Sequence, residues 1–146
     1  MSLAMDEFKK KFKIEELLIL ETEYWIWSLR PHQATLGAGV LSLKRECPTF
    51  GELNPVEFSD LNCIIKAIEK TLKYAFDYDI MNYLMLMMVD KQVHYHVIPR
   101  YESDVHLFDD SWSDADWPGI PNSSGNVLDM DKLMEIHSFI IGNLKD

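Results

Sequence analysis

The sequence predicts a single α+β domain, because short strand-like segments are interrupted by one long amphipathic helix and followed by another helix. The chain has 146 residues, which is the size of one domain, so one domain is expected over 1–146. Strands are expected where short apolar runs are bounded by polar or turn-forming residues: 17–20, 24–29, 35–43, 80–88 and 92–100.

The long helix has the clearest local signals in the chain. Asn54 is a favourable N-cap, Pro55 fits the first helical position, and Glu57 can close a capping box. Apolar residues then recur at helical spacing along one stripe: Phe58, Leu61, Ile65, Ile68, Leu72 and Ala75. These signals predict a helix that packs on the core of the domain.

Helices are also expected at both ends of the chain. A capping aspartate begins a short helix over 6–12, and 131–144 has the apolar spacing of an amphipathic helix. Residues 1–4 precede a second methionine, Met5, and are set aside as a candidate cloning remnant. The stretch 102–128 is rich in Asp, Pro, Gly and Trp, so it is expected to be a long irregular segment.

The last two predicted strands are expected to form a hairpin. A tight turn at Asp90 and Lys91 would join 80–88 to 92–100. So short a connection requires the two strands to run antiparallel.

Composition narrows the class of protein and of ligand. Hydrophobic residues make up 47% and charged residues 26%, as is typical of a packed domain. The net charge of −10 disfavours binding to an extended nucleic acid, whereas a small anionic ligand needs only local positive charge. The apolar runs are short and carry charges, so no membrane span is expected, and the Lys-rich start lacks the apolar stretch of a signal peptide. Two cysteines suit a reducing compartment, and a cytoplasmic location is expected.

The strongest candidate site lies in the last predicted strand. Alternate residues of a strand share a face, so Gln92, His94 and His96 are expected to point the same way, with neighbours roughly 6.5 to 7 Å apart. An imidazole has a pKa of about 6.5, so near neutral pH it is largely unprotonated and can attack an electrophile. A second imidazole can donate a hydrogen bond to a phosphoryl oxygen, and Arg100 supplies a permanent charge close by.

Three interpretations of this histidine pair compete. The pair can be an ordinary polar face of a half-buried sheet, or it can bind a metal ion together with a third ligand. His32, His106 and His137 are the other histidines that sequence alone leaves open as that ligand. The third interpretation is phosphate chemistry, and the wider sequence pattern favours it.

That pattern is a resemblance to the histidine-triad (HIT) family. The run from His94 to Tyr101 resembles the family signature His-φ-His-φ-His-φ-φ, which is followed in many members by Pro-Arg. Upstream, 36–45 resembles the family's earlier strand with its basic exit, and 79–83 resembles the strand before the triad. The likeness covers about Tyr24 to Tyr101.

The resemblance implies an antiparallel sheet of about five strands with a long helix and a C-terminal helix packed on it, commonly in a homodimer. It also implies a hydrolase or transferase that cleaves at the α-phosphate of nucleoside phosphoramidates or dinucleoside polyphosphates. The middle histidine, His94 here, would attack phosphorus and form a nucleotidyl-histidine, which water then hydrolyses. His96 would contact the phosphate, and neither a metal nor another cofactor is required. Gln92, at the first triad position, is predicted to be catalytic together with His94 and His96.

Candidate phosphate-binding side chains flank this pair. Lys44, Asn82 and Arg100 are assigned this role as a prediction. Lys44 has the alternative of a solvated strand end, and Asn82 has that of a bond to the local backbone.

The chain also departs from the family pattern. Gln92 stands at the first triad position, Ala38 stands where an earlier histidine is common, and Met87-Met88 replaces a common Gly-Asn. These changes remove polar groups from the expected pocket. They motivate an alternative function, a nucleotide-binding module of the same fold with impaired catalysis. A metal-dependent hydrolase is a third, weaker hypothesis.

Overall fold

The computed structural model describes residues 2–121 and 127–146. Over these residues the chain forms a five-stranded antiparallel sheet in the order β1-β2-β3-β5-β4 and a separate β6–β7 hairpin. The strands are β1 (Leu18–Glu21), β2 (Trp25–Leu29), β3 (Gly39–Leu43), β4 (Ile80–Leu84), β5 (His94–Arg100), β6 (Val105–Leu107) and β7 (Asp110–Trp112). The helices are α1 (Leu3–Lys11), α2 (Pro55–Phe76) and α3 (Met130–Gly142), with a 3-10 turn, η1, at Phe50–Glu52. The predicted α+β class and the antiparallel sheet of five strands are confirmed.

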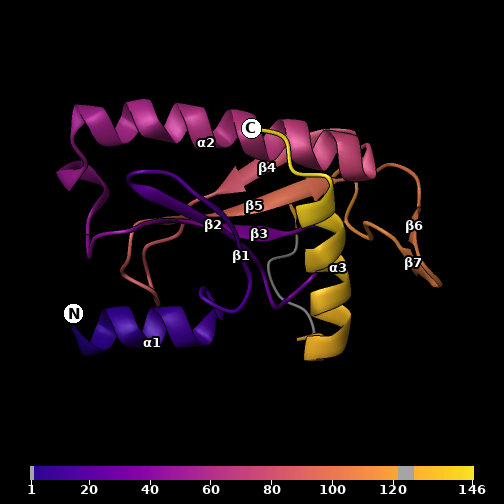
Figure 1. Cartoon of the computed structure of the whole chain (residues 1–146), viewed down its shortest axis with the longest axis horizontal. Coiled ribbons are helices and arrows are strands. Elements are labelled where there is room, and N and C mark those ends of the chain that lie inside the picture. The colour runs from indigo at the N-terminus through magenta and orange to yellow at the C-terminus, as the bar shows by residue number, and fades with distance from the viewer. Residues whose placement is uncertain (1, 122–126) are drawn as a thin grey trace.

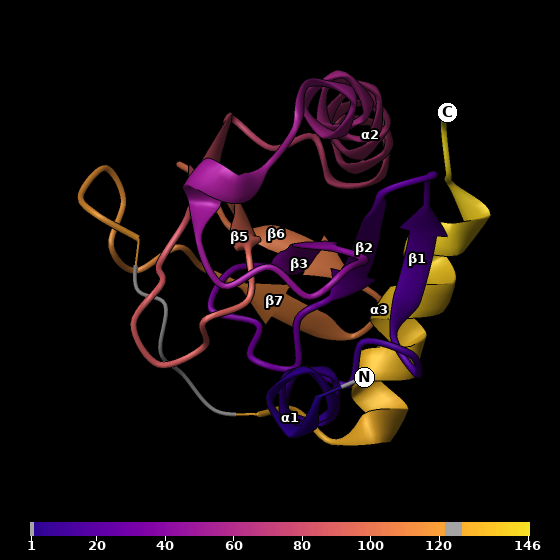
Figure 2. The same cartoon turned by 90° about the vertical axis from the view of Figure 1, so that its left-hand side faces the viewer.

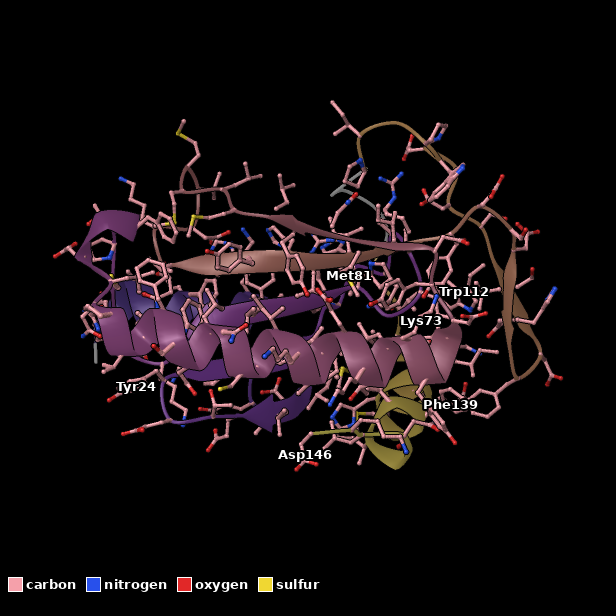
Figure 3. All side chains as sticks on the ribbon, turned by 90° about the horizontal axis from the view of Figure 1, so that it is seen from above. Tyr24, Lys73, Met81, Trp112, Phe139 and Asp146 are labelled. Atoms are coloured by element: carbon pink, nitrogen blue, oxygen red, sulfur yellow. The ribbon has the colours of Figure 1, made fainter. Side chains whose placement is uncertain are left out.

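The sheet lies between two helices of very different length. Figures 1 and 2 show α2 along one face and the short α1 on the opposite face, while α3 lies beside β1 at the sheet's edge. Figure 3 views α2 from outside, with Tyr24 near its beginning and Phe139 of α3 near its end. The Phe139 ring stacks there on that of Phe76, with centroids 5.5 Å apart. Helix α1 therefore covers a face of the sheet that α2 and α3 leave open.

Helix α2 begins as its sequence predicts. The Asn54 side chain accepts a hydrogen bond from the Glu57 N–H, and the Glu57 carboxylate accepts one from the Asn54 N–H, which completes a capping box. Leu61, Ile68 and Leu72 of the predicted stripe are buried against the sheet, as is Ile64, whereas Phe58 is half exposed. Burial of this stripe against the two β2 tryptophans, which are fully buried, forms the main core.

Strand β5 lies between β3 and β4, which places its two histidines at the centre of the sheet. His96 pairs with Val40 on one side and Leu84 on the other, and His94 pairs with Ser42. The alternating residues Tyr95 and Val97 pack in the main core under α2. The histidines therefore lie on the α1 face of the sheet.

The prediction of a tight turn at Asp90 and Lys91 is wrong. Strand β4 ends at Leu84 and β5 begins at His94, so residues 85–93 form a longer connection. On the other side of β5 the pairing continues through Val93, whose N–H donates to the Cys47 carbonyl and whose carbonyl accepts from the Leu43 N–H. Pairing with β4 ends sooner, at Leu84 opposite His96. The predicted antiparallel pairing of β4 and β5 is confirmed.

The strand expected over 35–43 is also shorter than predicted, since β3 begins at Gly39. The side chain of Gln33 holds the preceding residues in a compact turn. Its amide N–H groups donate to the Arg30 and Ala38 carbonyls, and its oxygen accepts from the Gly37 N–H. A side chain that bonds this much local backbone competes with strand pairing.

The two ends of the chain are helical, with shifted bounds. Helix α1 starts at Leu3 rather than at residue 6, because the Ser2 hydroxyl caps it by accepting from the Met5 N–H. Residues 2–4 are thus part of that helix or its cap. In the segment 102–128, the β6–β7 hairpin is regular structure that the sequence did not predict. The part of that segment over 122–126 lies outside the described residues.

In the described ranges, no helix is both long enough and apolar enough to cross a membrane.

Candidate active site

A cavity of about 230 Å³ opens between α1, β5 and the 85–93 connection. His94 and His96 line it from the sheet, and Lys11 and Phe12 line it from the end of α1. Arg30, which follows β2, contributes a buried guanidinium to the same wall. The two histidines expected to act together are therefore on one cavity, with two cationic side chains beside them.

His94 is held by the backbone of its own strand segment. Its Nδ1 lies 2.5 Å from the carbonyl oxygen of Gln92. A carbonyl oxygen can only accept, so Nδ1 must carry the proton in this contact. In the neutral ring Nε2 is then the unprotonated nitrogen, with its lone pair available for attack. The Phe8 and Phe12 rings of α1 pack on the imidazole at centroid distances of 5.1 and 6.0 Å.

Both imidazoles are kept uncharged by their surroundings. Burial is the largest effect on His94 and lowers its pKa, although the hydrogen bond to the Gln92 carbonyl opposes this. Burial lowers the pKa of His96 to about 4, and electrostatic interaction with the Arg30 guanidinium and with the neighbouring His94 ring adds to this effect. At neutral pH the cavity therefore presents two neutral imidazoles, the form in which a histidine is a nucleophile.

His96 stands next to His94 with an unused hydrogen-bonding atom. The two ring centroids are 5.1 Å apart and the rings are nearly perpendicular. Buried Nδ1 of His96 has no hydrogen-bond partner among the residues that the structure describes. A buried polar atom without a partner is costly, so a ligand that supplies one would be favoured here.

The side chain of Gln92, predicted to be catalytic, is occupied elsewhere. Its amide oxygen accepts from the Cys47 N–H at 2.9 Å. Its amide nitrogen donates to the carbonyls of Leu43 at 2.9 Å and Arg45 at 2.7 Å. The side chain therefore ties the start of β5 to the segment that follows β3, and Gln92 reaches His94 through its backbone carbonyl.

Arg100 and Asn82, predicted to bind phosphate, lie in a separate network. The Arg100 guanidinium donates to the Asp114 carboxylate at 2.6 and 3.2 Å, and both side chains are almost fully buried. It also donates to the Asn82 side-chain oxygen at 3.0 Å and to the Gly119 carbonyl at 2.9 Å. These bonds hold the segment around 114–119 against the sheet and do not reach the His94 cavity.

Lys44, the third predicted phosphate-binding residue, follows β3 and is not among the residues that line the His94 cavity. Its ammonium group is 3.7 Å from the carboxylate of Glu21 on β1. Both side chains are partly exposed, which fits the solvated strand end that the sequence left as an alternative.

Sequence reasoning missed Lys11 and Arg30, the cationic side chains that do line the cavity. Lys11 carries one recoverable signal, because it follows the buried Phe8 by three residues and so shares its helix face. Arg30 carries another, since it comes directly after the apolar run that forms β2 and just before Pro31. Neither signal indicates proximity to His94.

The metal interpretation requires a third ligand near the two histidines. Within 2–121 and 127–146, no group of three His, Cys, Asp or Glu side chains is placed to hold a metal ion. Of the candidate ligands, His137 contacts the Leu18 carbonyl at 2.6 Å and His106 is exposed on β6. His32 lines the His94 cavity.

Comparison with solved structures identifies the architecture. The chain is similar to a histidine triad (HIT) protein from Sinorhizobium meliloti, with a TM-score of 0.73 over 95% of this chain and 94% of that one, at 19% identity. The fold is histidine-triad-like. Histidine-triad relatives of this fold include a hypothetical nucleotide-binding protein from Sulfolobus tokodaii, at TM-score 0.68 and 17% identity, covering 87% of this chain and 82% of that one.

A third protein with the histidine-triad-like fold is a diadenosine triphosphate hydrolase from Plasmodium falciparum. It matches at TM-score 0.66 and 13% identity over 88% of this chain and 76% of that one. No protein-family model matches the sequence, and no curated protein matches it either. The resemblance first noted in the sequence is therefore supported at the level of the fold.

Proposed function

We propose that the chain is a hydrolase or transferase that acts at the α-phosphate of a small nucleotide. The observation that carries the proposal is the contact of His94 Nδ1 with the Gln92 carbonyl, in a cavity shared with His96. This contact leaves Nε2 of a neutral ring as the free nucleophilic atom. The nucleotide-binding and hydrolase relatives of the same fold support the choice of substrate class.

The proposed reaction has two displacements. Nε2 of His94 forms a bond to the α-phosphorus of a nucleoside phosphoramidate or dinucleoside polyphosphate, and the bond from phosphorus to the leaving nitrogen or oxygen breaks. The leaving group takes the electron pair of that bond and gains a proton. Water then attacks the same phosphorus, so the P–N bond to His94 breaks and a nucleoside monophosphate is released.

Two neighbouring side chains would stabilise the negative charge of the phosphoryl group. His96 would bond a phosphoryl oxygen, and Arg30 would offset negative charge that develops at phosphorus. Gln92 acts through its backbone carbonyl, which orients the His94 ring. The proposed reaction assigns no role to Lys44, Asn82 or Arg100, because their side chains are bonded outside the cavity. A homodimer stays a prediction from the resemblance, and a cytoplasmic location stays a prediction from the two cysteines.

Turnover of a small substrate panel tests the proposal. Adenosine phosphoramidate and diadenosine polyphosphates are incubated with the protein and followed by ³¹P NMR. The wild type should turn over at least one substrate. The control variant His106→Ala, which changes an exposed histidine on β6, should do the same. His94→Ala should lose about a thousand-fold or more of that rate. Absence of wild-type turnover, or equal rates for wild type and His94→Ala, contradicts the proposal.

A nucleotide-binding module without catalysis is the second candidate, and the burial of the nucleophile favours it. His94 is only 1% exposed, and the 230 Å³ cavity is smaller than the ~300 Å³ at which ligand sites usually begin. In this case the protein binds nucleoside monophosphate but never forms a covalent adduct. Mass spectrometry of acid-sensitive nucleotidyl adducts separates the two candidates, since an adduct on His94 is formed only by an enzyme.

Turnover that persists in excess chelator would exclude the metal-dependent hydrolase.

A further inference from the structure

We propose that Lys11 binds the phosphate of a substrate in the His94 cavity. In the free protein Lys11 is paired with Asp90, and an anionic substrate would replace the Asp90 carboxylate as its partner. This inference rests on the proposed function and adds a residue to the same site. Lys11 Nζ lies 2.8 Å from a carboxylate oxygen of Asp90. The ion pair joins the last turn of α1 to the 85–93 connection, which are distant in sequence.

Two cavities meet at the ion pair and at Val89. Lys11 and Asp90 both line the His94 cavity, and both also line a larger neighbouring cavity of about 650 Å³. Phe8 and Gln92 line the second cavity but not the first. We expect the parting of Lys11 from Asp90 to widen the passage between the two spaces, and a whole nucleotide needs more volume than the first cavity has.

The charges around the cavity favour an exchange of anions. The two histidines of the cavity are neutral. The positive groups that line the cavity are therefore Lys11 and Arg30, and its acidic group is Asp90. Lys11 also lies over the Phe12 ring, with Nζ 5.3 Å from the centroid, and Phe12 packs on His96. This places the ammonium beside the catalytic pair. A phosphate that carries up to two negative charges attracts it more strongly than one carboxylate does.

The exposure of the ion pair makes exchange feasible. The Lys11 side chain is 51% exposed and that of Asp90 is 20% exposed. Ion pairs that are open to solvent contribute little to stability, so breaking this one costs little. The contact is consequently suited to a reversible role at the mouth of the site.

The same helix provides a matched control. Lys10 is one residue before Lys11 and lines a different groove, together with Lys9, Lys13 and nearby acidic residues. Removing the Lys10 charge changes the net charge of the protein by the same amount without touching the His94 cavity. Any effect specific to Lys11 is therefore a local effect.

Titration calorimetry with AMP, at constant pH and ionic strength, tests the inference. Lys11→Met should weaken AMP binding at least ten-fold, whereas Lys10→Met should change it less than two-fold. Asp90→Asn should tighten AMP binding several-fold, because the competing carboxylate is removed. Adenosine, which lacks the phosphate, should bind Lys11→Met and the wild type equally. Thermal melting of each variant confirms that it is folded.

Two results would overturn the inference about Lys11 and leave the proposed function standing. One is equal AMP affinity for Lys11→Met and a wild type that binds AMP. The other is weaker binding by Asp90→Asn, which would make the ion pair a structural support for the site. Failure of the wild type to bind AMP would overturn both this inference and the proposed function.

Discussion

His94 donates from Nδ1 to the main-chain carbonyl of Gln92 across 2.5 Å. The side chain of the same Gln92 binds the backbone of Leu43, Arg45 and Cys47. One residue therefore orients the nucleophilic ring with its backbone and secures the beginning of β5 with its side chain. The orientation of His94 depends on how firmly this short segment is held.

The pH dependence of catalysis should reflect the burial of His94. Its folded-state pKa is lowered, so the ring stays neutral below pH 6.5, and activity is lost only as pH falls through that lowered value. The acid limb of kcat/KM for a diadenosine polyphosphate should lie below pH 6.5. Circular dichroism at each pH checks that the protein remains folded. An acid limb at or above pH 6.5 in the folded protein would contradict this assignment.

Replacing Gln92 should reduce stability more than it reduces chemistry. Gln92→Ala leaves the buried Leu43 carbonyl, the partly buried Arg45 carbonyl and the buried Cys47 N–H without their partner, and we expect a loss of about 3 kcal/mol in urea unfolding. Gln92→His should also destabilise, because a neutral imidazole has one donor and cannot serve both carbonyls. The exposed neighbour provides the control, and Lys91→Ala should stay within about 0.5 kcal/mol of the wild type.

Activity separates positioning from catalysis at Gln92. The folded fraction of either variant should keep kcat within about ten-fold of the wild type, since the backbone carbonyl that orients His94 remains. A loss of kcat comparable to that of His94→Ala, in a variant with unchanged stability, would show instead that the amide takes part in the reaction.

The Arg100–Asp114 pair should be a determinant of stability and not of phosphate binding. Asp114→Asn leaves the buried guanidinium without its counter-charge, and urea unfolding should show a loss of about 3 to 5 kcal/mol. Asp116→Asn, at an exposed site two residues later, should change stability by less than about 0.5 kcal/mol. AMP affinity of folded Asp114→Asn should match the wild type within two-fold. A ten-fold loss of affinity at full stability would place Arg100 in the binding site after all.

Local patterns were sufficient for several parts of this fold. The capping box at Asn54 and Glu57 defines the start of α2 because its hydrogen bonds join residues three apart. The common face of His94 and His96 follows from the two-residue period of a strand. Both features are decided within a few residues, so the sequence shows them directly.

Long-range pairing decided the features that the sequence predicted wrongly or missed. Pairing of β4 with β5 ends at Leu84 opposite His96, so the turn expected at Asp90 and Lys91 does not form. Lys11 enters the site from a helix far from β5 in sequence, and no local signal shows that approach.

By itself the sequence determined the α+β class, the long helix and the alternation that directs two histidines to one side of a strand. Those features depend on contacts between near neighbours and on the period of apolar residues. Only the tertiary structure decided which charges reach the histidines. Arg100 follows the same alternation as His96, yet it is bound by Asp114, whereas Lys11 and Arg30 reach the cavity from α1 and the end of β2. The electrostatics of a site depend on groups that folding brings together, and their distances are not encoded in spacing along the chain.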